Sequence, residues 1–289
     1  MFKVSVIVPV YNAENFLEDA VESAVHLDYV REVILVEDAS PDNALAICKQ
    51  LEKKYKKVKL YRHPNNENRG AGASRNLGIE NATSDYIAFL DADDWYEPNR
   101  FEVEEQLLPN NEVDGVYGAT GFYYESSKSK DNTKLTAISE TIRPEDLLFE
   151  FVKPNGGRFT TDAITYNRVF LLSIGLFQTD LRLHQDSELF IRSLVQGNLV
   201  NGICDRPIAF RRVHPNNRIS NPNKDNHIRY FKKVVDYLMQ SEKRVEKRVL
   251  RVLLKSLIIS LSKGNDPWSR AKVVLTLAVR KPIWLIKII

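Results

Sequence analysis

The sequence predicts an α/β fold, with a mostly parallel sheet flanked by helices and followed by a C-terminal helical extension. Short apolar runs alternate with segments of helical apolar spacing through the first hundred residues, which is typical of βαβ units with right-handed crossovers. Hydrophobic residues make up 43% of the 289 residues and charged residues 27%, enough for a substantial core. Near residue 225 the chain becomes strongly basic, which marks the extension.

Four apolar runs in the first hundred residues are the predicted strands: Val4–Val10, Val33–Val36, Val58–Tyr61 and Tyr86–Leu90. Helices are predicted between them. In Phe16–Val25 apolar residues line one face, with Asn12 as the expected cap and Glu14 in the first turn. Pro41–Tyr55 is the second predicted helix. The third, Arg69–Ala82, begins with a glycine-rich turn.

The pattern is less regular after Pro109. The predicted strands there are Val113–Ala119, Phe159–Asn167 and Pro207–Val213. Asp186–Gly197 has helical spacing, with Leu189 and Phe190 on its inward face. The polar segment Ser126–Thr136 is expected to be a surface loop, and His214–Lys224 is the best candidate linker.

The charge pattern predicts one large domain, residues 1–224, and a basic amphipathic tail, residues 225–289. The tail carries 15 basic and 5 acidic residues, a net charge of +10, whereas the rest of the chain has a net charge of −7. Such a tail indicates an anionic partner, either a membrane or a nucleic acid. One stripe of a predicted helix collects the basic residues Arg244, Lys247, Arg248, Arg251 and Lys255, opposite the apolar Val249, Leu253 and Leu257.

Two hypotheses account for the tail. The aromatic, aliphatic and basic residues of Trp268–Ile289 suit a membrane interface. Alternatively, the tail is a helical hairpin packed on the body with a solvated basic face. No apolar run approaches the roughly 20 residues of a membrane span, and no signal peptide is expected. Cys48 and Cys204 are too few and too distant for a disulfide framework, which favours a cytoplasmic location.

Acidic residues follow two of the predicted strands at their carboxyl ends. Asp38 follows Val33–Val36, and Asp91 and Asp93 follow Tyr86–Leu90. Ligands bind at this edge of open parallel sheets. Crowded carboxylates need a positive neutraliser, and Mg²⁺ or Mn²⁺ prefers such oxygen ligands together with substrate phosphates. The pattern therefore favours a metal–diphosphate site, although an isolated Asp-x-Asp is often only a turn.

The glycine-rich turn at residues 68–76 adds backbone amides and Arg75, both suited to phosphate. No Gly-Lys-Ser/Thr follows it, so it is not a Walker loop. It does not follow the first strand directly, so it is not a dinucleotide-binding fingerprint either.

Four motifs in this order resemble the inverting family-2 glycosyltransferases, which have the glycosyltransferase A fold. The motifs are Val4–Asn12, Val36–Ser40, Asn68–Gly70 with Ser74–Asn76, and Asp91–Asp94. The resemblance is strong over residues 3–100, looser over 101–220, and does not cover the tail. It implies a nucleotide-binding half at 1–100 and an acceptor-binding, catalytic half at 101–224.

The resemblance also implies roles in donor binding. The residues that match the nucleotide site are Pro9, Tyr11 and Glu14 at the base, Asp38 at uracil, Arg75 near the nucleotide and Asp91 at the ribose. Asp93 would hold the metal. A carboxylate accepts the N3–H of uracil but repels the N3 lone pair of cytosine, which favours UDP. Glu37 stands where the family often has Asp.

The second half matches the family at its catalytic motif. Asp186 would be the general base, with Gln185 in place of the usual Glu. Spacing alone does not separate Asp186 from Glu188, but the motif register favours Asp186. Downstream, the segment 211–220 resembles the part of the family that closes over the diphosphate, so His214 would bind metal or phosphate. Arg212 and Arg218 would neutralise the leaving group.

The expected function is inverting transfer of a sugar from a UDP-sugar to a glycan or lipid-linked glycan hydroxyl, with Mn²⁺ or Mg²⁺, in bacterial surface polysaccharide synthesis. The tail would then bind the inner face of an anionic membrane, and no nucleic acid partner is expected. Two alternatives remain open. One is a haloacid-dehalogenase-like phosphatase with Asp91 as nucleophile, and the other is an inactive nucleotide- or glycan-binding module.

Overall fold

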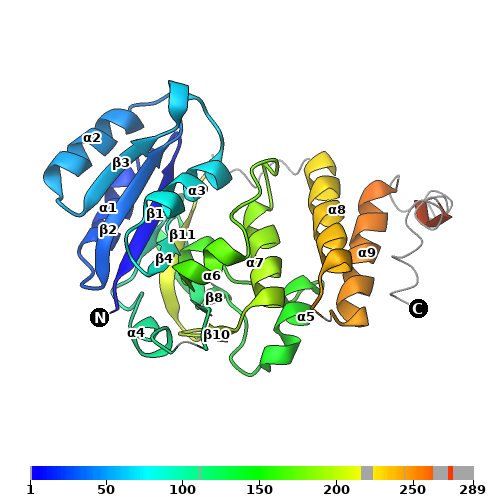
Figure 1. Cartoon of the computed structure of the whole chain (residues 1–289). Coiled ribbons are helices and arrows are strands. Elements are labelled where there is room, and N and C mark those ends of the chain that lie inside the picture. Colours follow the sequence, from blue (N-terminus) through cyan, green and yellow to red (C-terminus); the bar gives the residue numbers. More distant parts are fainter. Residues whose placement is uncertain (1, 111, 216–223, 244, 263–272, 276–289) are drawn as a thin grey trace.

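The computed structural model describes all residues except 1, 111, 216–223, 244, 263–272 and 276–289. Its centre is a sheet with the strand order β10-β6-β9-β4-β1-β2-β3 (Figure 1). The strands are β1 (Val4–Val10), β2 (Val30–Glu37), β3 (Val58–Arg62), β4 (Tyr86–Phe89), β6 (Gly115–Tyr117), β9 (Ile164–Asn167) and β10 (Leu199–Asn201). All neighbours pair in parallel except β9, which is antiparallel to both β4 and β6.

Both faces of this sheet are buried. In β1, Val6 and Val8 point into the core that α1 (Leu17–Val25) and α2 (Ala44–Lys54) cover, while Ile7 points into the core on the opposite face. The alternation follows from the two-residue period of a strand. It explains the nearly continuous apolar runs of the sequence, because a parallel strand covered on both sides needs apolar residues at every position.

The remaining helices build the second half. They are α3 (Ala71–Asn81), α4 (Glu104–Leu107), α5 (Leu147–Val152), α6 (Arg168–Ser173), α7 (Gln185–Gln196), α8 (Lys224–Gln240) and α9 (Lys247–Leu261), with short 3₁₀ turns at Pro64–Asn66, Pro144–Asp146 and Thr161–Ala163. α7 confirms the predicted helix, with Leu189 and Phe190 fully buried.

A second sheet has the strand order β5-β11-β7-β8. Its strands are β5 (Trp95–Tyr96), β7 (Ala119–Tyr124), β8 (Ser129–Thr136) and β11 (Pro207–Val213). The surface loop predicted at Ser126–Thr136 is wrong, because most of it is β8. This edge strand carries exposed polar side chains and, among the described strands, pairs with β7 alone, so side-chain periodicity does not reveal it.

Three other predicted boundaries shift. α1 begins at Leu17 with Phe16 at its cap, so Asn12 is not the cap; it has a positive φ of 55° and its backbone N–H donates to Ser40 Oγ at 3.3 Å. The predicted strand Val113–Ala119 is divided between β6 of the first sheet and the first residue of β7 in the second sheet. The predicted strand Phe159–Asn167 becomes a 3₁₀ turn followed by β9.

The described part of the C-terminal extension is a helical hairpin packed on the body (Figure 1). α8 contacts α7 and α9, and α9 contacts α5. Val234 on α8 and Leu253 and Leu257 on α9 are buried in the same core as the sheet residue Ile7. Among the described residues, no helix is long and apolar enough to cross a bilayer. Most of Trp268–Ile289, the segment expected at a membrane interface, and Arg244 lie outside the described residues.

Candidate functional site

The candidate site lies at the carboxyl ends of β1, β2 and β4, which are neighbours in the sheet. Tyr11 directly follows β1 and Asp38 directly follows β2, while one residue separates Asp91 from the end of β4. Open parallel sheets bind ligands at this edge. The topology therefore brings together three residues that are far apart in the sequence.

Asp38 holds the glycine-rich turn in place. The carboxylate is 1% exposed, and its two oxygens accept the backbone N–H groups of Arg69 at 2.7 Å and Gly70 at 2.8 Å. Gly70 has a φ of +87°, which an L side chain would rarely adopt. Since each carboxylate oxygen has a second lone pair, Asp38 retains acceptor capacity beyond these two bonds.

His63 is a site residue that the sequence reasoning missed. It follows β3 directly and is 5% exposed, with Nε2 3.1 Å from Ser74 Oγ and 3.6 Å from Asp38 Oδ1. Burial lowers the pKa of His63 more than nearby Asp38 raises it, so its ring is neutral at pH 7. The signal that could have identified His63 is its position directly after β3, the strand next to β2.

Two of the residues that the resemblance assigns to the base, Tyr11 and Glu14, lie on the loop between β1 and α1. Pro9 is half-buried in β1, and Tyr11 is 39% exposed. Glu14 is hydrogen-bonded to the loop before α2 both as a donor and as an acceptor. Its backbone N–H donates to Asp42 Oδ2 at 2.8 Å, and its carboxylate accepts the Asn43 N–H at 3.0 Å. The two loops thus form one rim beside Asp38.

Glu37, the departure from the family pattern, is turned into the sheet edge. It is 2% exposed and accepts the Ser40 N–H at 2.6 Å and the Arg62 guanidinium at 2.8 Å. In this structure it ties the ends of β2 and β3 together.

Asp91 and Arg75 meet as an ion pair. Arg75 Nη2 donates to Asp91 Oδ1 at 2.5 Å, and the guanidinium lies over the ring of Phe177. The backbone N–H of Asp91 donates to Asp162 Oδ1 at 2.8 Å. The Arg75 side chain is 6% exposed and that of Asp91 is 36% exposed, so the carboxylate is the part of the pair that faces outward.

Three carboxylates could hold a divalent cation. Asp91, Asp93 and Asp94 each place an oxygen within 4.8 Å of the others, and this is the one such group among the described residues. His214 Nε2 lies 3.1 Å from Asp93 Oδ2, and their role as metal ligands stays a prediction. Oxygen donors with one imidazole fit Mg²⁺ or Mn²⁺. Asp94 is the inward member, because it is 3% exposed and its Oδ1 accepts the Arg212 N–H at 2.7 Å.

Two buried acidic residues, Asp94 and Asp162, support this loop from the interior of the protein. Burial raises the pKa of Asp94 well above its usual range, and the carboxylate of Asp162 adds to the effect. Burial, followed by the charge of Asp91, raises the pKa of Asp162 to about 7. Asp162 is hydrogen-bonded to Asp94, and Arg100, fully buried, donates to the Asp162 carbonyl at 2.9 Å. The sequence reasoning missed Asp162 and Arg100.

The Arg212 guanidinium is held by acidic groups. It pairs with Asp19 at 3.1 Å and Glu125 at 3.0 Å, and its Nε donates to the Asp93 carbonyl at 3.0 Å. It therefore lies directly beside the carboxylate cluster, and its role at a leaving group stays a prediction. Arg218 lies outside the described residues.

The start of α7 faces the glycine-rich turn. A Cβ at Gly72 would lie 2.5 Å from Gln185 Oε1, and one at Gly70 would lie 3.1 Å from Arg182 Nη1. Asp186, partly exposed, stands in the first turn of α7, where its Oδ1 accepts the Ser187 N–H at 2.7 Å. The structure thus places Asp186 near the turn that Asp38 holds.

Glu188 has a different environment from Asp186. It is 4% exposed, and both its oxygens accept from the Arg192 guanidinium at 2.8 Å. Arg192 also donates to the carbonyls of Ile174, Gly175 and Leu176. Glu188 is therefore committed to a buried ion pair, whereas Asp186 is the partly exposed carboxylate at this helix start.

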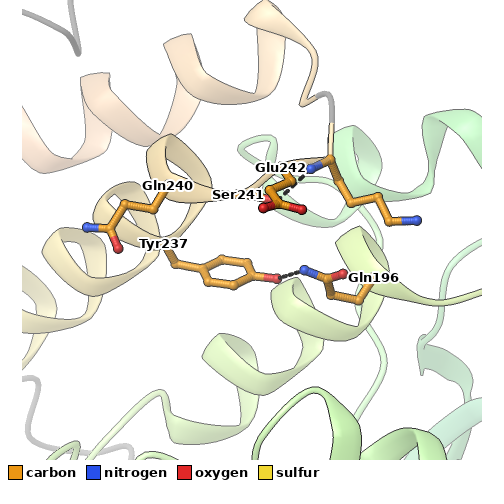
Figure 2. Close-up of a pocket in the computed structure, with 6 residues that line it drawn as sticks. Gln196, Tyr237, Gln240, Ser241 and Glu242 are labelled. Carbon is orange, nitrogen blue, oxygen red and sulfur yellow. Dashed lines mark hydrogen bonds between the residues drawn. The ribbon is translucent and has the colours of Figure 1, made fainter.

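A cavity of about 320 Å³ lies at the other end of α7, and Figure 2 shows residues that line it. Its lining residues are Gln196, Tyr237, Gln240, Ser241, Glu242 and Lys243. At about 1.5 Å of rise per residue, Gln196 is roughly 15 Å along the helix from Asp186. The cavity is therefore separate from the strand-end site.

The parallel sheet, the acidic groups after β2 and β4 and the carboxylate cluster define the glycosyltransferase A class of folds. Solved structures agree. TarS of S. aureus, residues 1–349 in complex with UDP-GlcNAc, aligns over 99% of this chain and 79% of its own with a TM-score of 0.67 at 18% identity. The mannosyltransferase PcManGT of Pyrobaculum calidifontis, in complex with GDP-Man and Mn²⁺, aligns over 99% of this chain and 85% of its own with a TM-score of 0.56, also at 18% identity.

The chain belongs to glycosyltransferase family 2. The model of that family, described as glycosyl transferase family 2, matches residues 5–174, which confirms the resemblance found in the motifs. An uncharacterized glycosyltransferase of Haemophilus influenzae is 37% identical over 41% of this chain and 47% of the relative. The uncharacterized glycosyltransferase EpsJ of Bacillus subtilis is 28% identical over 81% of this chain and 69% of the relative.

A glycosyltransferase of Rickettsia conorii, also uncharacterized, is 30% identical over 77% of this chain but only 35% of its own length. The chain thus spans about half or less of the first relatives that it matches.

Proposed function

We propose that this chain is an inverting glycosyltransferase that moves a sugar from a UDP-sugar to a hydroxyl of a glycan or a lipid-linked glycan. The observation that carries the proposal is the contact of Gln185 with Gly72. It brings the helix start that bears Asp186 against the turn that Asp38 holds. A candidate base and a candidate nucleotide site are thereby combined in one place.

The donor is proposed to be a uridine nucleotide. The Asp38 carboxylate, which retains lone pairs, accepts the uracil N3–H, and Pro9, Tyr11 and Glu14 line the base. The N–H groups in the first turn of α3 have no intrahelical partner and face the diphosphate. The UDP-GlcNAc bound by TarS supports this donor class.

A divalent cation, Mn²⁺ or Mg²⁺, is proposed at Asp93 and His214. When bound, it would offset negative charge on the diphosphate. Asp91 stands beside them, held by Arg75 and facing the ribose. The Mn²⁺ in PcManGT supports this choice of ion.

In the proposed reaction Asp186 accepts the proton of the acceptor hydroxyl as the oxygen attacks the anomeric carbon. The attack comes from the side opposite the nucleotide, so the configuration at that carbon inverts. The leaving UDP gains negative charge, which the first turn of α3 and the arginine side chains stabilise. Asp186 serves best as a partly exposed carboxylate, because a general base must reach the hydroxyl at about 2.6–3.2 Å.

The acceptor is proposed to belong to a bacterial surface polysaccharide, and the enzyme to act in the cytoplasm at the inner face of the membrane. The exposed basic side chains of Lys247, Arg251 and Lys255 on α9 support attraction to an anionic surface.

Two measurements test the function. Calorimetry with UDP, GDP and CDP, each with and without Mn²⁺, should give metal-dependent binding of UDP alone. Release of UDP from a panel of UDP-sugars should fall about 10²- to 10⁴-fold in Asp186→Asn, while that variant binds UDP as the wild type does.

The opposite outcomes are equally informative. Binding of all three nucleotides would contradict the role of Asp38 at uracil. Unchanged turnover in Asp186→Asn would exclude Asp186 as the base. UDP binding without turnover of any UDP-sugar would favour the inactive module instead.

A further inference from the structure

α8 contacts the segment that leads into α7. Arg229 Nη1 donates to the Asp180 carbonyl at 3.1 Å. Lys233 Nζ donates to Gln178 Oε1 at 2.9 Å and lies 2.9 Å from the Asp180 carboxylate. Three polar contacts thus fix residues 178–180 to a helix of the C-terminal extension.

A histidine pair continues this contact up to the start of α7. His184 Nε2 lies 3.3 Å from His227 Nε2, with ring centroids 4.5 Å apart at an interplanar angle of 73°. The ring of Tyr230, one turn further along α8, lies 5.0 Å from that of His184. A neutral imidazole has one donor and one acceptor nitrogen, so the two Nε2 atoms can form one hydrogen bond.

His184 occupies a backbone position that needs such support. It caps α7 with a φ of 62°, in the left-handed region that residues other than glycine seldom adopt. Such strain persists where the surroundings hold the residue in place. Burial lowers the pKa of His184, which keeps the ring neutral and able to pair with His227. The direction in which α7 leaves this turn sets the place of Asp186, two residues on.

The same segment is held from the opposite side by the donor half. Arg182 and Gln185 reach the glycine-rich turn at Gly70 and Gly72. The stretch 178–186 therefore lies between α8 and the start of α3. The two elements that flank this stretch, α8 and the start of α3, are more than a hundred residues apart in the sequence.

We infer that His227 is a positioning residue for the reaction: through His184 it fixes the turn that sets the place of the Asp186 carboxylate. The inference rests on the proposed function and deepens it. α8 then contributes to catalysis through the start of α7, although it lies beyond residues 5–174, the region that the family model matches.

The test compares three variants in the full chain. His227→Leu removes the hydrogen bond to His184, and His227→Gln retains a side chain that can donate or accept it. Tyr237→Phe is the matched control, because it removes another bond between α7 and α8, from Gln196 Nε2 to Tyr237 Oη at 2.9 Å, at the far end of the helices (Figure 2). The assay is release of UDP from a UDP-sugar with water as the acceptor, since the attacking water gives its proton to the same carboxylate.

We expect kcat of His227→Leu to fall about 10- to 100-fold, because an ångström of misplacement can cost about a hundredfold. The KM for the UDP-sugar and the affinity for UDP should stay near the wild-type values. His227→Gln should recover most of kcat, and Tyr237→Phe should leave kcat unchanged while lowering the melting temperature about as much as His227→Leu does.

An equal loss of kcat in His227→Leu and Tyr237→Phe would overturn the inference, because α8 would then act only through general stability. Wild-type kcat in His227→Leu, or a change confined to KM, would overturn it as well. The proposed function fails in a distinguishable way: the wild type would release no UDP, or Asp186→Asn would be as active as the wild type.

Discussion

At the scale of single residues, the two carboxylates at the start of α7 differ by burial and partner. Glu188 is paired with Arg192 inside the protein, while Asp186 is partly exposed. The sequence places both in the first turn of one helix, and spacing does not assign them different roles. The ion pair does, because a carboxylate held by a guanidinium on both oxygens is not available to a substrate.

Glu188→Gln should therefore lower stability and leave chemistry intact. Removing one partner of a buried ion pair leaves the other charge uncompensated, and we expect the free energy of unfolding to fall by about 3 kcal/mol. Urea titration measures this loss. kcat for the folded fraction should stay within about threefold of the wild type, since a packing role makes no contact with the transition state.

Asp186→Asn is the matched comparison, with a large loss of kcat and little change in stability. If Glu188→Gln lost turnover while its unfolding curve stayed in place, the two roles would have to be exchanged.

The strand-end positions of Asp38, Asp91 and Asp93 could be predicted because each lies shortly after the end of an apolar run, and the fold brings such positions together. Arg100 and Asp162 could not. The bond from the Asp91 N–H to Asp162 joins residues 71 apart in the sequence. Nothing local to residue 162 indicates that its carboxylate will be buried beside another acid.

At the scale of elements, the predicted strands that correspond to β1, β3 and β4 have nearly the observed bounds because both faces of the sheet are covered, whereas β2 extends beyond the predicted Val33–Val36 to Val30–Glu37. β8 was missed for the opposite reason, since an exposed edge strand has no apolar period to detect. The cap of α1 was misplaced because asparagine is a common cap residue. In the structure the Asn12 backbone N–H is instead hydrogen-bonded to Ser40 Oγ, and the helix begins further on, at Leu17.

The packing of α3 on β1 depends on Gly78. A Cβ at that position would overlap Cγ2 of the fully buried Ile7. Gly78→Ala gains helix propensity but forces the helix off the strand, and overpacking of this kind costs about 1–3 kcal/mol. We expect a lower urea midpoint, with the glycine-rich turn at the start of the same helix displaced and UDP bound more weakly.

A double-mutant cycle is the control. In an Ile7→Ala background the side chain that meets the new Cβ is gone, so Gly78→Ala should cost less than in the wild type. Equal costs in both backgrounds would show that the close contact with Ile7 is not the cause.

At the scale of the whole molecule, α8 and α9 share the core of the catalytic sheet. Deleting residues 226–289 is therefore a poor test of membrane binding, because it also removes buried side chains such as Leu253 and Leu257. Substituting exposed charges leaves that core intact. The domain division at residue 224 stays a prediction, and α8 and α9 pack directly on the body.

Changing Lys247, Arg251 and Lys255 to Gln should weaken binding to phosphatidylserine vesicles. Each basic residue near such a surface contributes about 1 kcal/mol, so the three changes together should reduce affinity by about a hundredfold at low salt. Vesicle sedimentation measures it. The same changes at Lys49, Lys53 and Lys56, exposed near α2, remove equal charge elsewhere and should have little effect; equal losses in the two triples would mean that only net charge matters.

The antiparallel strand β9 also has a consequence for synthesis of the chain. β1 to β4 come from the first 89 residues, but β4 acquires its second neighbour only when residues 164–167 have left the ribosome. Until then Ile87 and Phe89 border an open sheet edge, and such an edge pairs readily with other chains. A nascent chain from which β9 has not yet emerged is thus the form most exposed to aggregation, and β9 ends that exposure by pairing with both β4 and β6.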